Sequence, residues 1–294
     1  TAWCEDYIAN IDKIVPDYMR FNNLDNVSLL SRFDTADKLR VWTGALRFAG
    51  GDHTHSFKVG NPLTRRAQAF RRAISRRMRA RGLRRYYSEP DKADRYLLYP
   101  LHLHPEASTS VLSPTYLDEY EVIRNIAFNL PEGVKLYVKD HVSAFGVPGN
   151  AFYESIARLP NVKFIQPFAP TKELIRGSLA VVTLTSTVGY EALLLGKRVF
   201  LFGNVFYEIH ENVVRVEDPS RIFELFQRWL AEPVKAGRDY NTRFIEAYYL
   251  ASFPGLLDPG GPDAPELAVK LYPDIAQYLE SGRMPAHSSQ RSAK

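Results

Sequence analysis

The chain has 294 residues, 45% of them hydrophobic, and carries a formal net charge of +5 at pH 7. This length and composition allow a substantial core in one large or two small domains and exclude a disordered chain. No segment approaches the roughly 18 consecutive apolar residues of a membrane-spanning helix, so none is expected. The single cysteine, Cys4, excludes an intrachain disulfide and a cysteine-rich zinc site, which is typical of a reducing compartment.

The first residues, TAWCEDYIANIDKIV, contain neither the basic stretch nor the apolar core of a signal peptide. The chain also begins at Thr1 rather than at a methionine, as a fragment or a processed chain does. We therefore expect a cytoplasmic protein that can lack residues upstream of Thr1.

Ten arginines lie between Arg65 and Arg85, in the stretch TRRAQAFRRAISRRMRARGLRRYY. Apolar residues recur there at spacings of three and four, which predicts an amphipathic helix with a cationic outer face. A solvated helix face is one interpretation, and an anionic membrane surface or an acidic glycan is the other. No base-reading module accompanies the arginines, so nucleic acid is not an expected partner. We favour attachment to the inner face of the cytoplasmic membrane.

From Arg95 onward, apolar strand patterns alternate with helical patterns through short turns. This alternation predicts a parallel sheet covered by helices on both faces, a doubly wound α/β fold. The strand patterns cover residues 95–103, 135–141, 161–166, 179–185 and 198–203, and the helical patterns cover 114–131, 150–160, 171–178 and 189–196.

Four segments follow from these patterns. Residues 1–93 form a helical, basic segment, and residues 94–232 form the Rossmann-like domain. Helical periodicity continues over 233–280, and the polar residues 281–294 are expected to be disordered.

Polar side chains follow three of the predicted strands. Parallel strands end at one edge of the sheet, and ligands bind there because the loops converge. The turn after strand 179–185 also brings backbone N–H groups and a helix N-terminus together, which suits an anion such as phosphate. We therefore predict one site at this edge. Its candidate residues are His102, His104, Glu106, Lys139, Asp140, His141, Ser186, Thr187, Gly189 and Glu191.

Several of these residues also have a purely structural interpretation. His102 and His104 alternate along the strand pattern, and buried histidines with both ring nitrogens hydrogen-bonded are common. Ser186 is a good helix N-cap, and Glu191 can complement the helix dipole. Lys139 and His141 form a pair of cations at a strand end, for which packing offers no reason.

Two segments resemble a known family. YLLYPLHLHPEASTSVLSPTYLDEYEVIRNIAFNLPEGVKLYVKDH and LTSTVGYEALLLGKRVFLFG are similar to the capsule polysaccharide biosynthesis family, bacterial glycosyltransferases of GT-B architecture that include Kdo transferases using CMP-Kdo. The resemblance covers about Tyr96 to Tyr207. In that family a Lys-Glu-His-Pro motif and a later Ser/Thr-rich turn contact the donor nucleotide. Residues 139–141 and 185–187 match these motifs, although Asp140 replaces the usual Glu and Val142 the usual Pro.

The resemblance implies a GT-B-like donor domain and a glycosyltransferase. The donor is a nucleotide sugar, CMP-Kdo among the candidates, and the acceptor is a capsule polysaccharide, another cell-surface polysaccharide or a lipid-linked glycan. The departing nucleotide phosphate requires cations and N–H groups, and Lys139, His141 and the Ser186–Thr187 turn are of the right types. Glu106 and His141 are the catalytic candidates. The donor-binding candidates are His102, His104, Lys139, Ser186, Thr187, Gly189 and Glu191.

No carboxylate, cysteine or histidine cluster has the spacing of metal ligands, so neither a metal nor another cofactor is expected. Two alternatives remain open. A nucleotide-sugar 2-epimerase would share the fold and act without an acceptor. A non-catalytic subunit for polysaccharide binding or assembly would turn over no donor.

Overall fold

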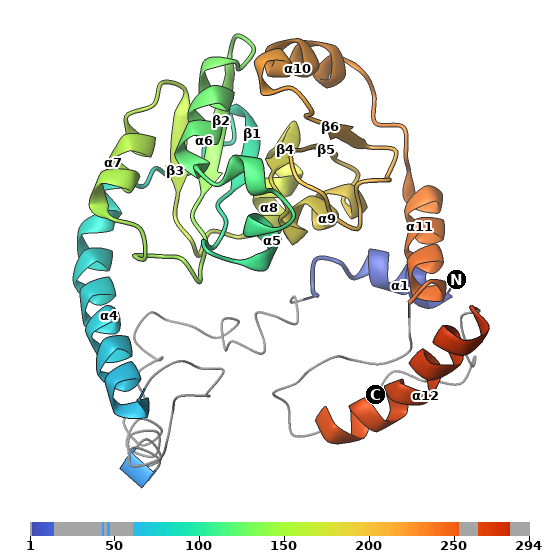
Figure 1. Ribbon diagram of the computed structural model, residues 1–294. Helices are drawn as coiled ribbons and strands as arrows, with labels where there is room; N and C mark the ends of the chain where they lie inside the picture. The colour runs from blue at the N-terminus through green and yellow to red at the C-terminus, as the bar shows by residue number, and fades with distance from the viewer. Residues whose placement is uncertain (1, 15–42, 44–45, 48–60, 253–263, 283–294) are drawn as a thin grey trace. The chain divides into compact units, whose positions relative to one another are not determined.

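The computed structural model describes residues 2–14, 43, 46–47, 61–252 and 264–282 (Figure 1). The chain divides into two units, Thr1–Ile11 with Ala236–Lys294 and Asp12–Lys235. Among the described residues, no helix combines the length and apolar character needed to cross a membrane.

The larger unit is built on six parallel strands in the order β3-β2-β1-β4-β5-β6. Numbered by sequence, this is the Rossmann order. The strands β2 and β3 are added outward on one side of β1, and the next three are added on its other side, so the order of strands switches between β1 and β4. The predicted doubly wound α/β fold is therefore confirmed. The strands are β1 Arg95–Pro100, β2 Val134–Lys139, β3 Val162–Ile165, β4 Ala180–Thr183, β5 Arg198–Leu201 and β6 Val213–Arg215.

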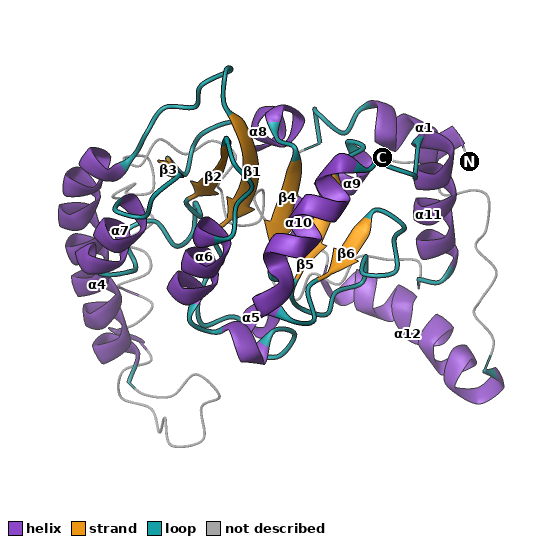
Figure 2. Cartoon of the chain, turned by 90° about the horizontal axis from the view of Figure 1, so that it is seen from above, coloured by secondary structure: helices purple, strands orange, loops and turns teal. Residues whose placement is uncertain are grey.

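Helices cover both faces of the sheet (Figure 2). The helices described in this unit are α4 Pro62–Leu83, which extends from the edge beside α7, and α5 Ala107–Ser110, α6 Glu119–Phe128, α7 Asn150–Ala157, α8 Thr171–Gly177, α9 Thr187–Leu194 and α10 Ile222–Ala231. Short 3-10 turns among the described residues are η2 Arg84–Tyr86, η3 Pro114–Tyr116 and η4 Pro219–Arg221.

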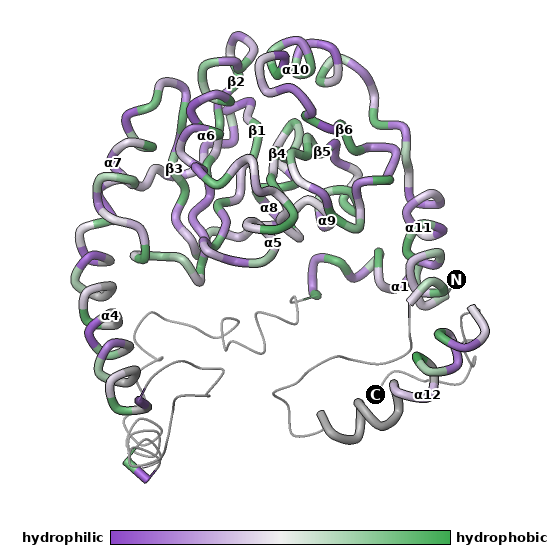
Figure 3. The backbone as a smooth tube through the Cα atoms, viewed as in Figure 1, coloured by the Kyte–Doolittle hydropathy of each residue, from purple (hydrophilic) through white to green (hydrophobic). Residues whose placement is uncertain are grey.

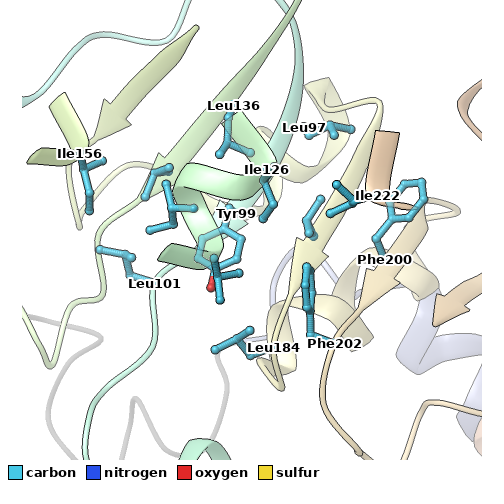
Figure 4. Close-up of a cluster of buried hydrophobic side chains, with 14 of the residues drawn as sticks. Leu97, Tyr99, Leu101, Ile126, Leu136, Ile156, Leu184, Phe200, Phe202 and Ile222 are labelled. Atoms are coloured by element: carbon cyan, nitrogen blue, oxygen red, sulfur yellow. The ribbon is translucent and has the colours of Figure 1, made fainter. Parts of the chain in front are cut away.

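Successive side chains of β1 point to opposite faces of the sheet and pack against the helices on each face. Leu97 and Tyr99 join one buried cluster with Ile126 of α6, and α7 and α10 also contribute to it (Figure 4). Tyr96 points to the other face, where its hydroxyl donates to the Leu174 carbonyl of α8 at 2.7 Å. Because successive side chains of a strand face opposite ways and both faces are covered, every residue of β1 after Arg95 is buried.

Element boundaries differ from the sequence analysis at several points. β1 ends at Pro100 rather than at residue 103, so His102 lies in a loop. The helix predicted from residue 114 begins only at Glu119, because Asp118 caps α6 by accepting the N–H of Glu121. The sequence analysis assigned no element to α5, β6 or α10. A three-residue strand is too short to show a period.

The predicted arginine helix is confirmed as α4. Hydrophilic and hydrophobic segments alternate along it (Figure 3), and Phe70, Ile74 and Met78 are exposed. Its last residue, Leu83, is fully buried in the core of the larger unit. The guanidinium of Arg79 donates to the carbonyls of residues 147 and 148, which follow β2.

The described residues of the smaller unit form α1 Ala2–Ala9, α11 Arg238–Leu250 and α12 Ala264–Ser281. The Trp3 ring of α1 lies 5.6 Å from the Tyr249 ring of α11. Pro273 lies inside α12. The predicted C-terminal helices are therefore confirmed. The predicted disordered tail begins within the last turn of α12, and its residues 283–294 lie outside the described part of the chain.

Candidate functional site

The strand ends place the predicted site residues at one edge of the sheet. Pro100 pairs with Lys139, which pairs in turn with Ile165, and Thr183 pairs with Leu201. The loops that leave these positions carry the candidate residues. These residues are close enough to interact electrostatically. The charges of His102, Lys139, Glu106 and Glu119 all influence the pKa of His141.

A carboxylate that the sequence analysis did not select, Glu119, organises the loop after β1. It is the first residue of α6 and is only 6% exposed. Its Oε1 accepts from the Tyr99 hydroxyl at 3.2 Å, the His102 backbone N–H at 2.9 Å and His102 Nδ1 at 2.7 Å. Its Oε2 lies 3.3 Å from His104 Nε2. The hydrogen bonds and charges of the two histidines outweigh burial, so the pKa of Glu119 is lowered.

The His102 ring joins this carboxylate to the turn after β4. Its Nε2 lies 3.2 Å from Thr183 Oγ1 and 3.3 Å from the backbone N of Thr185. Thr183 Oγ1 in turn accepts the N–H of Ser186 at 3.0 Å. Both ring nitrogens of His102 are therefore engaged inside the fold. His104 is more exposed, and the Glu119 carboxylate beside its ring raises its pKa against the effect of burial.

The turn before α9 leads from β4 into the N-terminus of that helix. Ser186 is the N-cap, and its Oγ accepts the Val188 N–H at 3.2 Å, so the structural interpretation of this serine holds. Thr187 is exposed at the first helical position. Thr185 is 7% exposed, and its Oγ1 has no hydrogen-bond partner among the described residues. A buried hydroxyl without a partner costs free energy unless a ligand or water satisfies it.

Gly189 lies in the first turns of α9 against Tyr207, which the sequence analysis did not select. The Tyr207 hydroxyl donates to the Ser186 carbonyl at 2.6 Å. A Cβ added at Gly189 would lie 2.5 Å from Tyr207 Oη and 2.9 Å from Cζ. Because glycine has no Cβ, the Tyr207 ring can pack directly against α9 and reach the Ser186 carbonyl of the turn.

Lys139 is a buried cation at the end of β2. It is 6% exposed, and its Nζ donates to the Pro167 carbonyl at 2.8 Å. Within the described part of the chain this is its one hydrogen bond, which leaves two of the three ammonium donors without a partner. Burial lowers its pKa to about 8, against the charges of Asp140 and Glu191, so the ammonium form prevails at pH 7.

Asp140 and His141 differ from the expectation of a simple cationic loop. Asp140 is buried, accepts from the Tyr87 hydroxyl at 2.6 Å and the His141 N–H at 2.7 Å, and burial raises its pKa to about 6. Burial, followed by the charges of His102 and Lys139, lowers the pKa of His141 to about 4. The expected pair of cations is therefore wrong, because His141 is neutral at pH 7. Its Nδ1 accepts the Ser143 N–H, so Nε2 carries the proton.

The two other predicted carboxylates lie in different environments. Glu106 is exposed and precedes α5, and its Oε2 accepts the Ser108 hydroxyl at 2.9 Å. Glu191 lies in α9, where burial raises its pKa against the charges of Lys172 and Lys139. Within the described part of the chain, no group of three or more His, Cys, Asp and Glu residues is placed to hold a metal ion.

Comparison with known proteins identifies the family. The model of the capsule polysaccharide biosynthesis protein family matches residues 34–211, more than half of the chain. The chain belongs to this family. The resemblance noted over Tyr96 to Tyr207 is thus confirmed, and the match extends further towards the N-terminus. A relative, protein FixF from Sinorhizobium fredii, is 32% identical over 175 residues. These residues make up 58% of this chain and only 42% of FixF, so the chain spans less than half of that relative.

Solved structures of other proteins resemble part of this chain at low sequence identity. The beta Kdo 2,7 transferase of Thermosulfurimonas dismutans KpsC is 19% identical, with a TM-score of 0.38 over 69% of this chain and 56% of that one. The UDP-GlcNAc 2-epimerase from Methanocaldococcus jannaschii is 13% identical, with a TM-score of 0.38 over 59% of this chain and 49% of that one. Similarity at this level does not identify the substrate of the family member described here.

Proposed function

We propose that this chain is the donor-binding part of a metal-independent glycosyltransferase that moves a sugar from a nucleotide-sugar donor, CMP-Kdo among the candidates, to a capsule or other cell-surface polysaccharide. Family membership supports the polysaccharide context. The observation that carries the donor site is a pair of buried polar groups at one sheet edge: the Lys139 ammonium, which makes one hydrogen bond within the described residues, and the Thr185 hydroxyl, which makes none there.

The donor phosphate suits these groups. Lys139 is only 6% exposed, so its charged form has lost most of its hydration, which costs free energy. A bound anion would offset that cost. The N-terminus of α9 adds oriented N–H groups at the turn, with the exposed Thr187 at its first position. A diphosphate or monophosphate ester would therefore bind between Lys139 and residues 185–187.

Sugar transfer requires a base for the acceptor and stabilisation for the leaving group. In the proposed reaction the acceptor hydroxyl oxygen bonds to the anomeric carbon, and the bond from that carbon to the phosphate oxygen breaks. The nucleotide leaves with the electron pair, and the hydroxyl proton passes to the carboxylate of Glu106, which is exposed. Lys139 and the neutral His141, whose Nε2 carries a proton, would stabilise the charge on the leaving phosphate.

Nucleotide binding tests the site directly. A thermal-shift panel of CMP, CDP, UDP and GDP selects the base, because a ligand of the native state raises its stability. Calorimetry with the best nucleotide then compares Lys139→Met with Lys135→Met, a matched control at the opposite end of β2. A charged hydrogen bond contributes about 1.5–3 kcal/mol, so Lys139→Met should bind about tenfold to hundredfold more weakly. Equal affinity in the two variants, or no binding by the wild type, would refute the assignment.

Turnover separates the proposed transferase from the alternatives. Donor consumption should depend on an added polysaccharide or lipid-linked acceptor. Consumption that is independent of acceptor would indicate an epimerase, and binding without turnover would indicate a non-catalytic subunit.

We also propose that α4 attaches the protein to the inner face of the cytoplasmic membrane, where lipid-linked acceptors reside. Phe70, Ile74 and Met78 recur every four residues on the helix, and all three are exposed. Exposed arginines, including Arg71 and Arg81, lie on the same helix. Each basic residue near an anionic surface contributes about 1 kcal/mol, and apolar side chains can enter the headgroup region.

Liposome flotation tests this attachment. The protein should float with anionic vesicles at low salt, remain behind with zwitterionic vesicles, and detach as salt rises. Replacing four helix arginines with Glu should abolish flotation, whereas a control with the same change in charge elsewhere should float. If the helix variant floats like the wild type, α4 is only a solvated surface. The helix variant changes Arg71, Arg72, Arg76 and Arg77, and the control changes Arg124, Arg158, Arg221 and Arg228.

A further inference from the structure

We propose that Glu119 is the positioning residue of the nucleotide site, acting through His102 on the turn before α9 and through His104 on the loop after β1. This inference rests on the proposed function of the turn as a phosphate site. Glu119 lies at the start of α6 and is too deeply buried to serve as a substrate ligand itself.

A single carboxylate gathers donors from one continuous stretch of chain. The Tyr99 hydroxyl, the His102 backbone N–H and His102 Nδ1 all meet Oε1 within 3.2 Å. The charge of a buried carboxylate is tolerated only when several donors compensate for lost hydration, and this cluster provides them. These hydrogen bonds hold the loop after β1 against the N-terminus of α6.

The backbone amide of Thr185 settles which nitrogen of His102 carries the proton. That amide is an obligatory donor, and it points at Nε2 from 3.3 Å. Nε2 must therefore present its lone pair, and Nδ1 carries the proton that Glu119 accepts at 2.7 Å. A donating Nδ1 and an accepting Nε2 are the arrangement of His102 that fits both neighbours.

From His102 the contacts continue into the turn. Thr183 Oγ1 accepts the Ser186 N–H at 3.0 Å, so its own proton is free to point at His102 Nε2, 3.2 Å away. An unbroken series of hydrogen bonds thus runs from Glu119 to the N-cap of α9. Because Thr185 and Ser186 belong to the proposed phosphate turn, the position of that turn depends on the carboxylate in another helix.

Oε2 of Glu119 serves a different histidine. His104 Nε2 lies 3.3 Å from it, and the groups that face His104 are Glu119, Glu106 and His102. Two carboxylates favour the protonated ring, and they raise its pKa. A charged His104 would add positive potential beside the proposed phosphate position, and this contribution disappears as pH rises through its pKa.

Glu119→Gln tests the proposal, because the amide is the same size and lacks the charge. Glu121→Gln is the matched control: it lies two residues along α6, its side chain is 57% exposed, and it pairs with Arg124. Long-range ¹H–¹⁵N spectra of histidine-labelled, full-length protein report the tautomer and titration of each ring. The wild type and the control should show Nδ1 of His102 as the hydrogen-bond donor and Nε2 as the acceptor. In Glu119→Gln, His104 should titrate at lower pH and the His102 ring signals should shift.

Affinity for CMP and UDP, measured by calorimetry, should fall about tenfold in Glu119→Gln at pH 7 and be unchanged in the control. Thr183→Val keeps the Glu119–His102 contact and removes the bridge to the turn, so it should also weaken nucleotide binding even if Glu119→Gln does not fold. Unchanged ring spectra in Glu119→Gln, or wild-type affinity in both variants, would overturn the proposal. Failure of the wild type to bind either nucleotide would refute the proposed function instead, and the spectra would still decide the role of Glu119.

Discussion

Replacing Gly189 with Ala should destabilise the larger unit through one contact. Gly189 is buried in α9, and a Cβ there would lie 2.5 Å from Tyr207 Oη, 2.9 Å from Cζ and 3.1 Å from Cε2. Cβ atoms do not approach other atoms this closely in folded proteins. Tyr207 is fully buried and held by its 2.6 Å hydrogen bond to the Ser186 carbonyl, so it cannot simply rotate away.

The size of the effect follows from three opposing contributions. Forcing a methyl group into a packed site costs about 1–3 kcal/mol. Displacing Tyr207 from the Ser186 carbonyl loses a hydrogen bond of about 1 kcal/mol. Exchanging glycine for alanine within a helix returns about 1 kcal/mol through backbone entropy. The variant should therefore be less stable than the wild type by about 1–3 kcal/mol.

Urea unfolding followed by circular dichroism measures this difference. Gly82→Ala is the control, because Gly82 also lies in a helix, α4, but a Cβ there meets nothing within 4 Å. It should leave stability unchanged or raise it by up to about 1 kcal/mol. Tyr207→Phe removes the hydroxyl, so the double variant with Gly189→Ala should be at least about 1 kcal/mol more stable than the sum of the single effects. Wild-type stability in Gly189→Ala, or strict additivity, would refute the contact.

Two further predictions concern charge. The pKa of Asp140 is raised to about 6 by burial, so its ionisation opposes folding: stability falls as pH rises from about 4 to about 6, by about 3 kcal/mol in total. Asp140→Asn should remove this loss, and its stability relative to the wild type should rise across pH 4–7 in urea titrations. A difference independent of pH would contradict the assigned pKa. Transferase activity should persist in EDTA, because Lys139 and the 185–187 turn supply the positive charge, and complete loss with rescue by Mg²⁺ would show that a metal is required.

Local pattern was sufficient to predict the five strands and the four longer helices between Arg95 and Leu201 and their parallel sheet, but not the four-residue helix α5. Apolar periodicity is a property of neighbouring residues, and alternating strands and helices with short turns allow few topologies. The same logic correctly placed Lys139, His141 and the 185–187 turn at one edge, because parallel strands all end there.

The protonation and partners of the site were decided by tertiary structure. Glu119 and His102 are 17 residues apart, and Tyr87 and Asp140 are 53 apart, so no local pattern reveals either pair. His141 is a potential cation in sequence and is neutral in the fold, because burial beside Lys139 penalises a second positive charge. Hydrophobic periodicity depends on the side chains of one element, whereas a pKa depends on the desolvation and charges that several elements bring to one point.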